Sequence, residues 1–183
     1  MRANRKTIAA IAMTLAIPAE GLRQFAYYDP PGILTVCYGT TGKEVVKGKK
    51  YSLEECRAFL ERDMLAAVDT VERCHPGLPD KVLAAFSDAV YNLGPSVACS
   101  STASRHLDAG NIAAACDQLP RWNKAKVGGV MVALPGLTKR RAAEQKLCLE
   151  GLSWNGVLPA SESNGAPSSA PGLVAARAAG QAV

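Results

Sequence analysis

Six cysteines, spread along most of the chain, constrain its fold more than any other feature. Their positions are Cys37, Cys56, Cys74, Cys99, Cys116 and Cys148. There is no C-x-x-C pair and there are only 2 histidines, so zinc-ligand spacing is absent. An even, well-separated set behind an export-like N-terminus indicates up to three disulfides in an oxidising compartment, although buried reduced thiols also fit. Sequence leaves the pairing open, and we expect the sequential one: Cys37–Cys56, Cys74–Cys99 and Cys116–Cys148.

The first 19 residues combine a basic start with a short apolar run. Arg2, Arg5 and Lys6 precede residues 7–19, which are apolar apart from two threonines. This composition is typical of a secretory signal, yet Ile17 is poorly suited to a cleavage site after Ala19. The same run also fits a first helix of the mature fold. Both interpretations hold if the segment inserts weakly into a membrane, is not cleaved, and later leaves it.

Composition divides the chain into three parts. Residues 1–19 are the segment just described, residues 20–152 have an ordinary globular composition, and residues 153–183 are rich in Ala, Gly, Ser and Pro. The whole chain has 183 residues, of which 48% are hydrophobic, enough for one domain with a core. We expect the final segment to be a flexible tail and assign it no function.

Two helices can be predicted with clear boundaries. Ser52 and Glu55 form a capping box, and apolar residues then recur at helical spacing to about Cys74. A second helix begins at Asp80 and ends at Gly94-Pro95. Because this second helix is apolar over most of its circumference, we expect it at the centre of the domain.

A third helix and a small sheet complete the predicted domain. Thr138 is expected to cap a helix from Lys139 to about Leu149, ended by Gly151. Between Asp29 and Lys50, β-branched and aromatic residues bracketed by glycines predict a hairpin or three short strands. The fold class is therefore α+β, mostly helical with a minor antiparallel sheet near the N-terminus.

Glu20, Asp29 and Thr35 are the residues that could carry chemistry. Cleaving a glycosidic bond requires a proton for the leaving oxygen and a second carboxylate that stabilises the oxocarbenium-like ring or activates water. Glu20 follows the apolar run, where desolvation would keep it protonated, whereas Asp29 lies in a polar turn and Thr35 could help it orient a water. On residues alone the alternative stays open that Asp29, before Pro-Pro-Gly, is simply a turn residue.

Other reactive sites are not supported. There is no G-x-S-x-G motif, and the phosphate-loop-like residues 39–43 lack the full pattern. The net charge of +5 suits an anionic partner, but no motif indicates nucleic acid. Most lysines and arginines, including the run at residues 139–141, are interpreted as solvated faces. In the helix predicted from Lys139, Arg141 and Glu144 are expected to form a structural pair. Trp122 is expected to belong to the core.

The string from Glu20 to Thr41 resembles the active-site signature of phage-type lysozymes, glycoside hydrolase family 24. In that resemblance Glu20 matches the general acid, Asp29 the second carboxylate and Thr35 the water-positioning threonine. Further matches follow in the family's order at residues 91–94, 116–122 and 136–144. The resemblance covers about residues 11–152.

The resemblance implies a lysozyme-like fold, with a cleft between two lobes joined by the long helix from Ser52. It implies an endolysin that hydrolyses, with inversion, the β-1,4 bond between N-acetylmuramic acid and N-acetylglucosamine of peptidoglycan. No metal or organic cofactor is implied, and we expect a monomer that does not bind nucleic acid. Tyr27 and Tyr28 either line the cleft or cover the hairpin.

The basic start, the weakly apolar segment and the cysteines resemble the signal-arrest-release subset of these endolysins. That resemblance implies export to the inner membrane and periplasm of the infected host, with action on the cell wall. Two other functions stay open: a lytic transglycosylase, which uses a single glutamate without water, and a non-catalytic protein that binds peptidoglycan.

Overall fold

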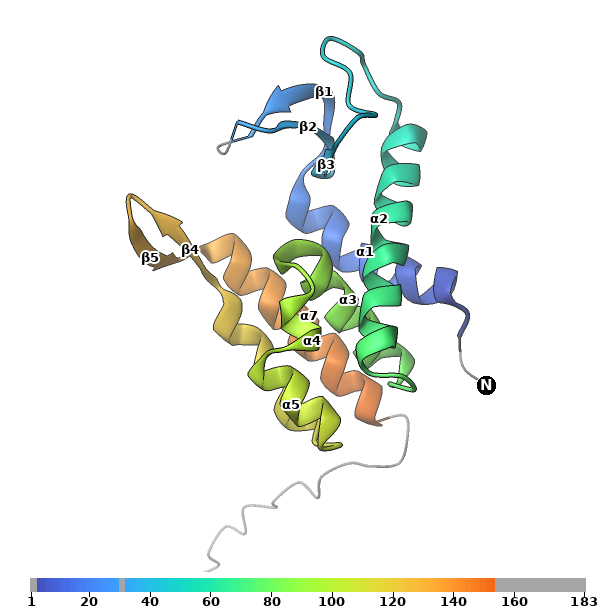
Figure 1. Ribbon diagram of the computed structural model, residues 1–183, viewed down its shortest axis with the longest axis vertical. Helices are drawn as coiled ribbons and strands as arrows, with labels where there is room; N and C mark the ends of the chain where they lie inside the picture. Colours follow the sequence, from blue (N-terminus) through green and yellow to red (C-terminus); the bar gives the residue numbers. More distant parts are fainter. Residues whose placement is uncertain (1–2, 30–31, 154–183) are drawn as a thin grey trace, which may run out of the picture.

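The computed structural model describes residues 3–29 and 32–153. Its elements are α1 (Arg5–Glu20), β1 (Arg23–Tyr28), β2 (Leu34–Cys37), β3 (Thr40–Thr41), α2 (Leu53–Cys74), α3 (Asp80–Leu93), α4 (Ser96–Cys99), α5 (Thr102–Asp108), α6 (Ile112–Cys116), the 3-10 helix η1 (Leu119–Trp122), β4 (Lys124–Val127), β5 (Val130–Ala133) and α7 (Pro135–Ser153). We call β1–β3 and their loops the sheet lobe, and α1 with α3–α7 the helical lobe. Helix α2 runs from one to the other (Figure 1). The predicted α+β fold is confirmed.

The sheet lobe is a three-stranded antiparallel sheet in the order β1-β2-β3. Tyr27 lies opposite Thr35, and Thr35 lies opposite Thr41. The prediction placed all strands after Asp29, and this is wrong for the first strand, which precedes it. Asp29 instead closes the turn between β1 and β2, where its carboxylate accepts a hydrogen bond from the backbone N–H of Ile33.

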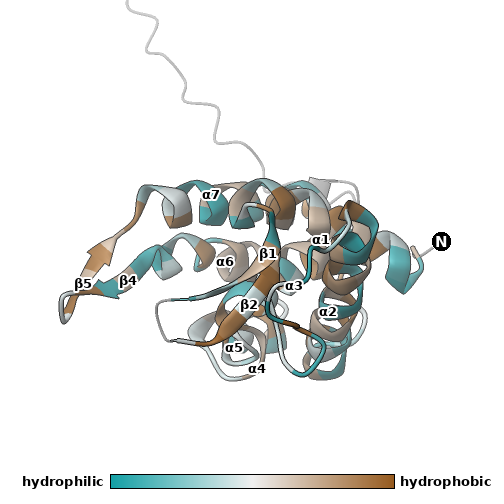
Figure 2. Cartoon of the chain, turned by 90° about the horizontal axis from the view of Figure 1, so that it is seen from above, coloured by the Kyte–Doolittle hydropathy of each residue, from teal (hydrophilic) through white to brown (hydrophobic). Residues whose placement is uncertain are grey.

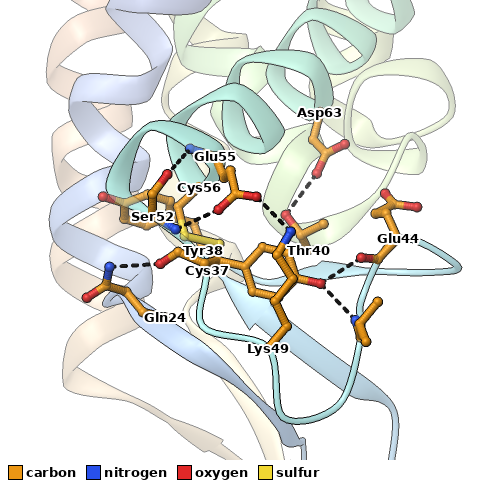
Figure 3. The surroundings of a disulfide bond; sticks show 12 residues. Gln24, Cys37, Tyr38, Thr40, Glu44, Lys49, Ser52, Glu55, Cys56 and Asp63 are labelled. Atoms are coloured by element: carbon orange, nitrogen blue, oxygen red, sulfur yellow. Dashed lines mark hydrogen bonds and ion pairs between the residues drawn. A yellow bond between two sulfur atoms is a disulfide. The ribbon is translucent and has the colours of Figure 1, made fainter.

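Helix α2 begins with the predicted capping box. The Ser52 hydroxyl accepts from the backbone N–H of Glu55, and the Glu55 carboxylate accepts from the backbone N–H of Ser52. Next to this cap the Cys37–Cys56 disulfide ties β2 to α2 (Figure 3). The sheet lobe is thereby attached to the long helix by a covalent bond as well as by chain connection.

Helix α3 is the centre of the helical lobe, as predicted. Every residue from Val82 to Val90 is buried, and the helix packs against α1, α2 and α7. This run includes Asp88, a charged residue with no exposed surface. The side chains that meet Asp88 are therefore part of the same core.

The three disulfides have the predicted sequential pairing. Besides the Cys37–Cys56 bond, Cys74–Cys99 joins the end of α2 to α4, and Cys116–Cys148 joins α6 to α7. The bonds close sequence separations of 19, 25 and 32 residues. Crosslinks over loops of this size stabilise a fold mainly by restricting the unfolded chain.

Helix α7 is longer at both ends than predicted. It begins at Pro135, a residue well suited to a first helical turn, and the Thr138 hydroxyl bonds to the carbonyl of Leu134 rather than marking the cap. Gly151 lies inside the helix instead of ending it. A Cβ there would come within 3.0 Å of Val82, so this glycine permits the close approach of α7 and α3.

Several elements have no counterpart in the sequence prediction. Helices α4, α5 and α6, the 3-10 helix η1 and each strand of the β4–β5 hairpin are shorter than eight residues, too short for a clear periodic pattern. The expected flexible tail lies outside the described residues from 154 onward. None of the helices within residues 3–29 and 32–153 is long and apolar enough to cross a membrane.

Candidate active site

Glu20 is the last residue of α1, at the point where the chain enters the sheet lobe. Gly21 follows with a φ of 67°, a conformation that glycine adopts without strain and that turns the chain into β1. The Glu20 side chain is 22% exposed, and one of its carboxylate oxygens accepts a hydrogen bond from Nη1 of Arg140. The prediction of apolar surroundings for Glu20 is therefore wrong, because its carboxylate contacts a guanidinium group contributed by α7.

Arg140 is fixed by a second carboxylate. Its Nε donates to Oδ2 of Asp88 at 2.9 Å and its Nη2 donates to Oδ1 at 2.8 Å, a two-point contact that sets the plane of the guanidinium group. Asp88 is fully buried and Arg140 is 5% exposed. Asp88 and Glu20 raise the pKa of Arg140 further, although burial acts in the opposite direction. The guanidinium group thus stays charged and points Nη1 at Glu20.

Tyr91 on α3 lies on the other side of this cluster. The Arg140 guanidinium carbon is 6.0 Å from the Tyr91 ring centre, and the Tyr91 hydroxyl donates to the backbone carbonyl of Tyr38 in the sheet lobe. Burial, reinforced by the charge of Glu20, raises the pKa of Tyr91. Its hydroxyl therefore remains protonated and connects the two lobes beside Glu20.

The predicted pair Arg141 and Glu144 is confirmed, and it is completely buried. Arg141 Nη2 donates to Oε1 of Glu144, while Nε of Arg140 lies 3.6 Å from the same oxygen. Burial, reinforced by the neighbouring Asp88, raises the pKa of Glu144. Arg140 and Arg141 thus bring Asp88, Glu144 and Glu20 together in one cluster where α1, α3 and α7 meet.

Asp29 and Thr35 are brought together by the β1–β2 turn. Asp29 Oδ1 accepts from the Ile33 backbone N–H at 2.7 Å, and Oδ2 lies 3.4 Å from the Thr35 hydroxyl. The hydroxyl is also 3.0 Å from the Ile33 carbonyl, so its single proton has two possible acceptors. One carboxylate oxygen is thus held by the backbone, and the other lies beside a hydroxyl that is almost buried.

The two tyrosines in β1 have different positions. Tyr27 is opposite Thr35 in the sheet, so the two side chains lie on the same face, and the Arg23 guanidinium lies 4.3 Å from the Tyr27 ring. Tyr28, one residue further, faces the opposite side and is 60% exposed. Of the two candidates for substrate binding, Tyr27 is therefore the one that lies beside Thr35.

Sequence reasoning missed Arg140 and Asp88, and it assigned the basic run at residues 139–141 to a solvated face. For Arg140 and Arg141 that is wrong, because both are buried. Two signals were present in the sequence: an aspartate in the middle of the apolar stretch of α3, and Glu144 placed to meet arginines three and four residues before it. In the described part of the chain, no group of three His, Cys, Asp or Glu side chains is placed to hold a metal ion.

Comparisons with known proteins agree with this arrangement. Residues 18–144 match the phage lysozyme family. The chain belongs to that family. The SAR-endolysin of Bacteriophage PS119 is 39% identical to this phage lysozyme over 133 residues, which are 72% of this chain and 77% of that protein.

Two solved structures show the same fold. The endolysin of Escherichia coli O157:H7 phage FAHEc1 is 29% identical, with a TM-score of 0.68 over 87% of this chain and 97% of that one. A mutant of P22 lysozyme is 28% identical, with a TM-score of 0.66 over 81% of this chain and 99% of that one. The lysozyme-like fold is thus established for this chain, whereas the roles of Glu20, Asp29, Thr35, Tyr27 and Tyr28 stay predictions.

The Asp88–Arg140 contact generates the first prediction for this phage lysozyme. Asp88→Asn removes one acceptor and leaves the buried guanidinium incompletely paired, which should cost about 3 kcal/mol of unfolding free energy. Because Nη1 would no longer be aimed at Glu20, kcat for peptidoglycan clearing should also fall, by about 10- to 100-fold. Urea unfolding and turbidity assays on folded protein measure the two effects. An unchanged kcat would show that Arg140 does not position Glu20.

A second substitution in the same cluster, Glu144→Gln, tests the protonation of the Glu144 carboxyl. Since burial raises the pKa of Glu144 above its ordinary value of 4.5, the folded protein keeps a proton that the unfolded chain releases, and its stability falls as the pH rises from that value. Glu144→Gln copies the neutral form and removes this loss. Urea unfolding at about pH 5 and about pH 8, near the limits of the usual range of maximal stability, measures the effect. The free energy of unfolding of the variant, relative to that of the wild type, should be higher at the higher pH. Parallel pH curves for the two proteins would rule out a neutral Glu144.

Proposed function

We propose that this phage lysozyme is an endolysin that hydrolyses the β-1,4 bond between N-acetylmuramic acid and N-acetylglucosamine in bacterial peptidoglycan. One observation carries the assignment of its site. Two carboxylates flank β1, with Glu20 fixed by Arg140 at one end and Asp29 fixed by the turn beside Thr35 at the other. Two carboxyl groups in different environments are what glycoside hydrolysis requires. The endolysin names of the relatives support the same substrate.

Each carboxyl group has a distinct task in the reaction. Glu20 gives its proton to the leaving glycosidic oxygen as the bond to the anomeric carbon breaks. The carboxylate that remains is next to Arg140, whose charge stabilises it most once the proton has left. This interaction favours the transition state over the ground state, which is the condition for catalysis.

Asp29 and Thr35 act on the water. Oδ2 of Asp29, the oxygen not held by the backbone, takes a proton from a water that attacks the anomeric carbon from the opposite face of the sugar. The Thr35 hydroxyl orients that water. One molecule of water is added across the bond, and the configuration at the anomeric carbon is inverted.

A lytic transglycosylase and a non-catalytic binding protein are less well supported. A transglycosylase needs one glutamate and no activated water, so it gives no role to a carboxylate held beside a threonine hydroxyl. A binding protein would not need a glutamate fixed by a buried arginine. The family membership of the chain likewise favours the hydrolase.

Substitutions of the three site residues test the proposed reaction. Glu20→Gln and Asp29→Asn should each reduce peptidoglycan clearing by at least about 100-fold, because one removes the acid and the other the base. Thr35→Ala should reduce it less, and Thr41→Ala, an exposed threonine opposite Thr35, is its control. Mass spectrometry of the products should show added water. Anhydro-muramic products, or full clearing by both carboxyl variants, would contradict the proposal.

The N-terminal helix supports a further proposal on localisation. We infer that residues 1–19 first hold the exported chain at the inner membrane and that the part from Arg5 onward later forms α1 of the active enzyme. The relative from phage PS119 is named a SAR-endolysin, and α1 exposes apolar side chains in the folded enzyme. Ile17 is 39% exposed, and Ala10, Met13 and Ile17 line a surface hollow of about 490 Å³. While the segment is in the membrane, Glu20 is kept away from Arg140, so the enzyme is inactive.

Two substitutions on the exposed face of α1 test this localisation. Ala10→Lys should leave the folded enzyme intact, because Ala10 is exposed, but add about 3 kcal/mol to membrane insertion. Thr14→Leu, also exposed, should strengthen membrane retention. Fractionation before and after collapse of the proton-motive force should show the wild type moving from membrane to periplasm, Ala10→Lys released early and Thr14→Leu late. Identical fractionation of all three proteins would contradict the inference.

A further inference from the structure

The β4–β5 hairpin exposes apolar side chains that the folded domain does not need. Its two strands are joined by Gly128 and Gly129, both with positive φ, as a tight two-residue hairpin turn requires. The exposed fractions are 53% for Val127, 66% for Val130, 59% for Met131 and 42% for Val132. A cluster of large apolar side chains on one projecting element of a soluble domain usually marks a binding surface.

The strand register divides the hairpin into two faces. Residues directly opposite each other lie on the same face, so Val127 with Val130 and Ala125 with Val132 form a wholly apolar face. Lys126 with Met131 and Lys124 with Ala133 form the other face, which is basic. The hairpin therefore offers an apolar strip and two cations on one narrow element.

The hairpin is close along the chain to Arg140, the residue that holds Glu20. It leads directly into α7, and Arg140 follows only five residues after Pro135, about 8 Å along the helix axis. Figures 1 and 2 show the β4–β5 hairpin projecting from the helical lobe toward the same side of the molecule as the β1–β2 hairpin, which carries Asp29. A chain-like substrate that reaches both Glu20 and Asp29 can continue onto this hairpin.

We propose that the β4–β5 hairpin binds the peptidoglycan strand beside the bond that is cleaved. The inference rests on the proposed function and adds a recognition surface to it. Sugar rings present apolar C–H faces that pack on the strip of Val127, Val130 and Val132. Stem peptides carry free carboxylates, which complement Lys124 and Lys126. The partner is thus a glycan strand bearing anionic peptides, and the hairpin contributes to its affinity rather than to the chemical step.

Isosteric substitutions separate binding from folding. The triple variant Val127→Thr, Val130→Thr, Val132→Thr keeps β-branched residues in the strands, so the hairpin should persist. It should raise KM for peptidoglycan about fivefold, with little change in kcat, because apolar contact area with the glycan is lost. Val46→Thr is the matched control, since Val46 is 54% exposed on a different loop.

A second variant tests the charges. Lys124→Gln with Lys126→Gln should raise KM for peptidoglycan but not for the same glycan stripped of its stem peptides, and Lys146→Gln on the exposed side of α7 is the control. Cosedimentation with insoluble peptidoglycan, with Glu20→Gln in every protein, measures binding without turnover. Weaker sedimentation of the hairpin variants than of the controls supports the proposal.

The outcomes distinguish this inference from the proposed function. If the wild type releases no reducing ends from peptidoglycan, the hydrolysis fails, and the hairpin's role is still measured by cosedimentation. If hydrolysis proceeds and the hairpin variants keep the KM and sedimentation of the wild type, the inference is overturned. It is also overturned if the variants lose only their cosedimentation with phosphatidylglycerol vesicles, since the hairpin would then bind a membrane.

Discussion

The buried guanidinium group of Arg140 is the interaction on which both the helical lobe and the site depend. It comes from α7, is held at two points by Asp88 on α3, and reaches Glu20 at the end of α1. A buried charge is costly unless it is fully paired, so these three helices can pack only with those partners in place. The position of Glu20 is consequently fixed by the same contacts that complete the core of the helical lobe, whereas Asp29 and Thr35 are held by the sheet lobe.

Helix α1 combines a face that packs in the core with an apolar face that is partly exposed, which an ordinary helix of a soluble domain does not need. Four of its residues, Ile8, Ala9, Ala12 and Ala16, are buried, yet the rest of the helix is also largely apolar and stays partly exposed. Packing in the folded enzyme does not require this exposed apolar face, and the membrane location proposed above would give it a role. Because Glu20 ends this helix, its contact with Arg140 forms only when α1 docks on α3 and α7. The helix that anchors the chain would then also control its activity, with no separate regulatory domain.

The sequence predicts contacts between residues that are close along the chain better than contacts between distant residues. The capping box at Ser52, the apolar face of α3 and the Asp29–Thr35 pair each involve residues close in sequence, and the predicted elements and contacts are present. The Glu20–Arg140 contact joins residues 120 positions apart, and no local sequence pattern around either residue predicts it. The sequence therefore predicts a solvated face for Arg140 and apolar surroundings for Glu20, and both predictions are wrong. Asp88 in the apolar stretch of α3, together with Glu144 on α7, indicated that buried cations had to meet them.

The sequence analysis also missed the β4–β5 hairpin, because local patterns do not reveal it. A short strand pair with a glycine turn and with nearly every residue exposed has no buried face to reveal it by hydrophobic periodicity. It is defined by its register and by its place at the start of α7, a few residues before Arg140. An element that adds nothing to the core can vary in sequence without unfolding the domain. It is thus the part of this enzyme in which affinity for a particular cell wall can change while the buried cluster that positions the acid stays the same.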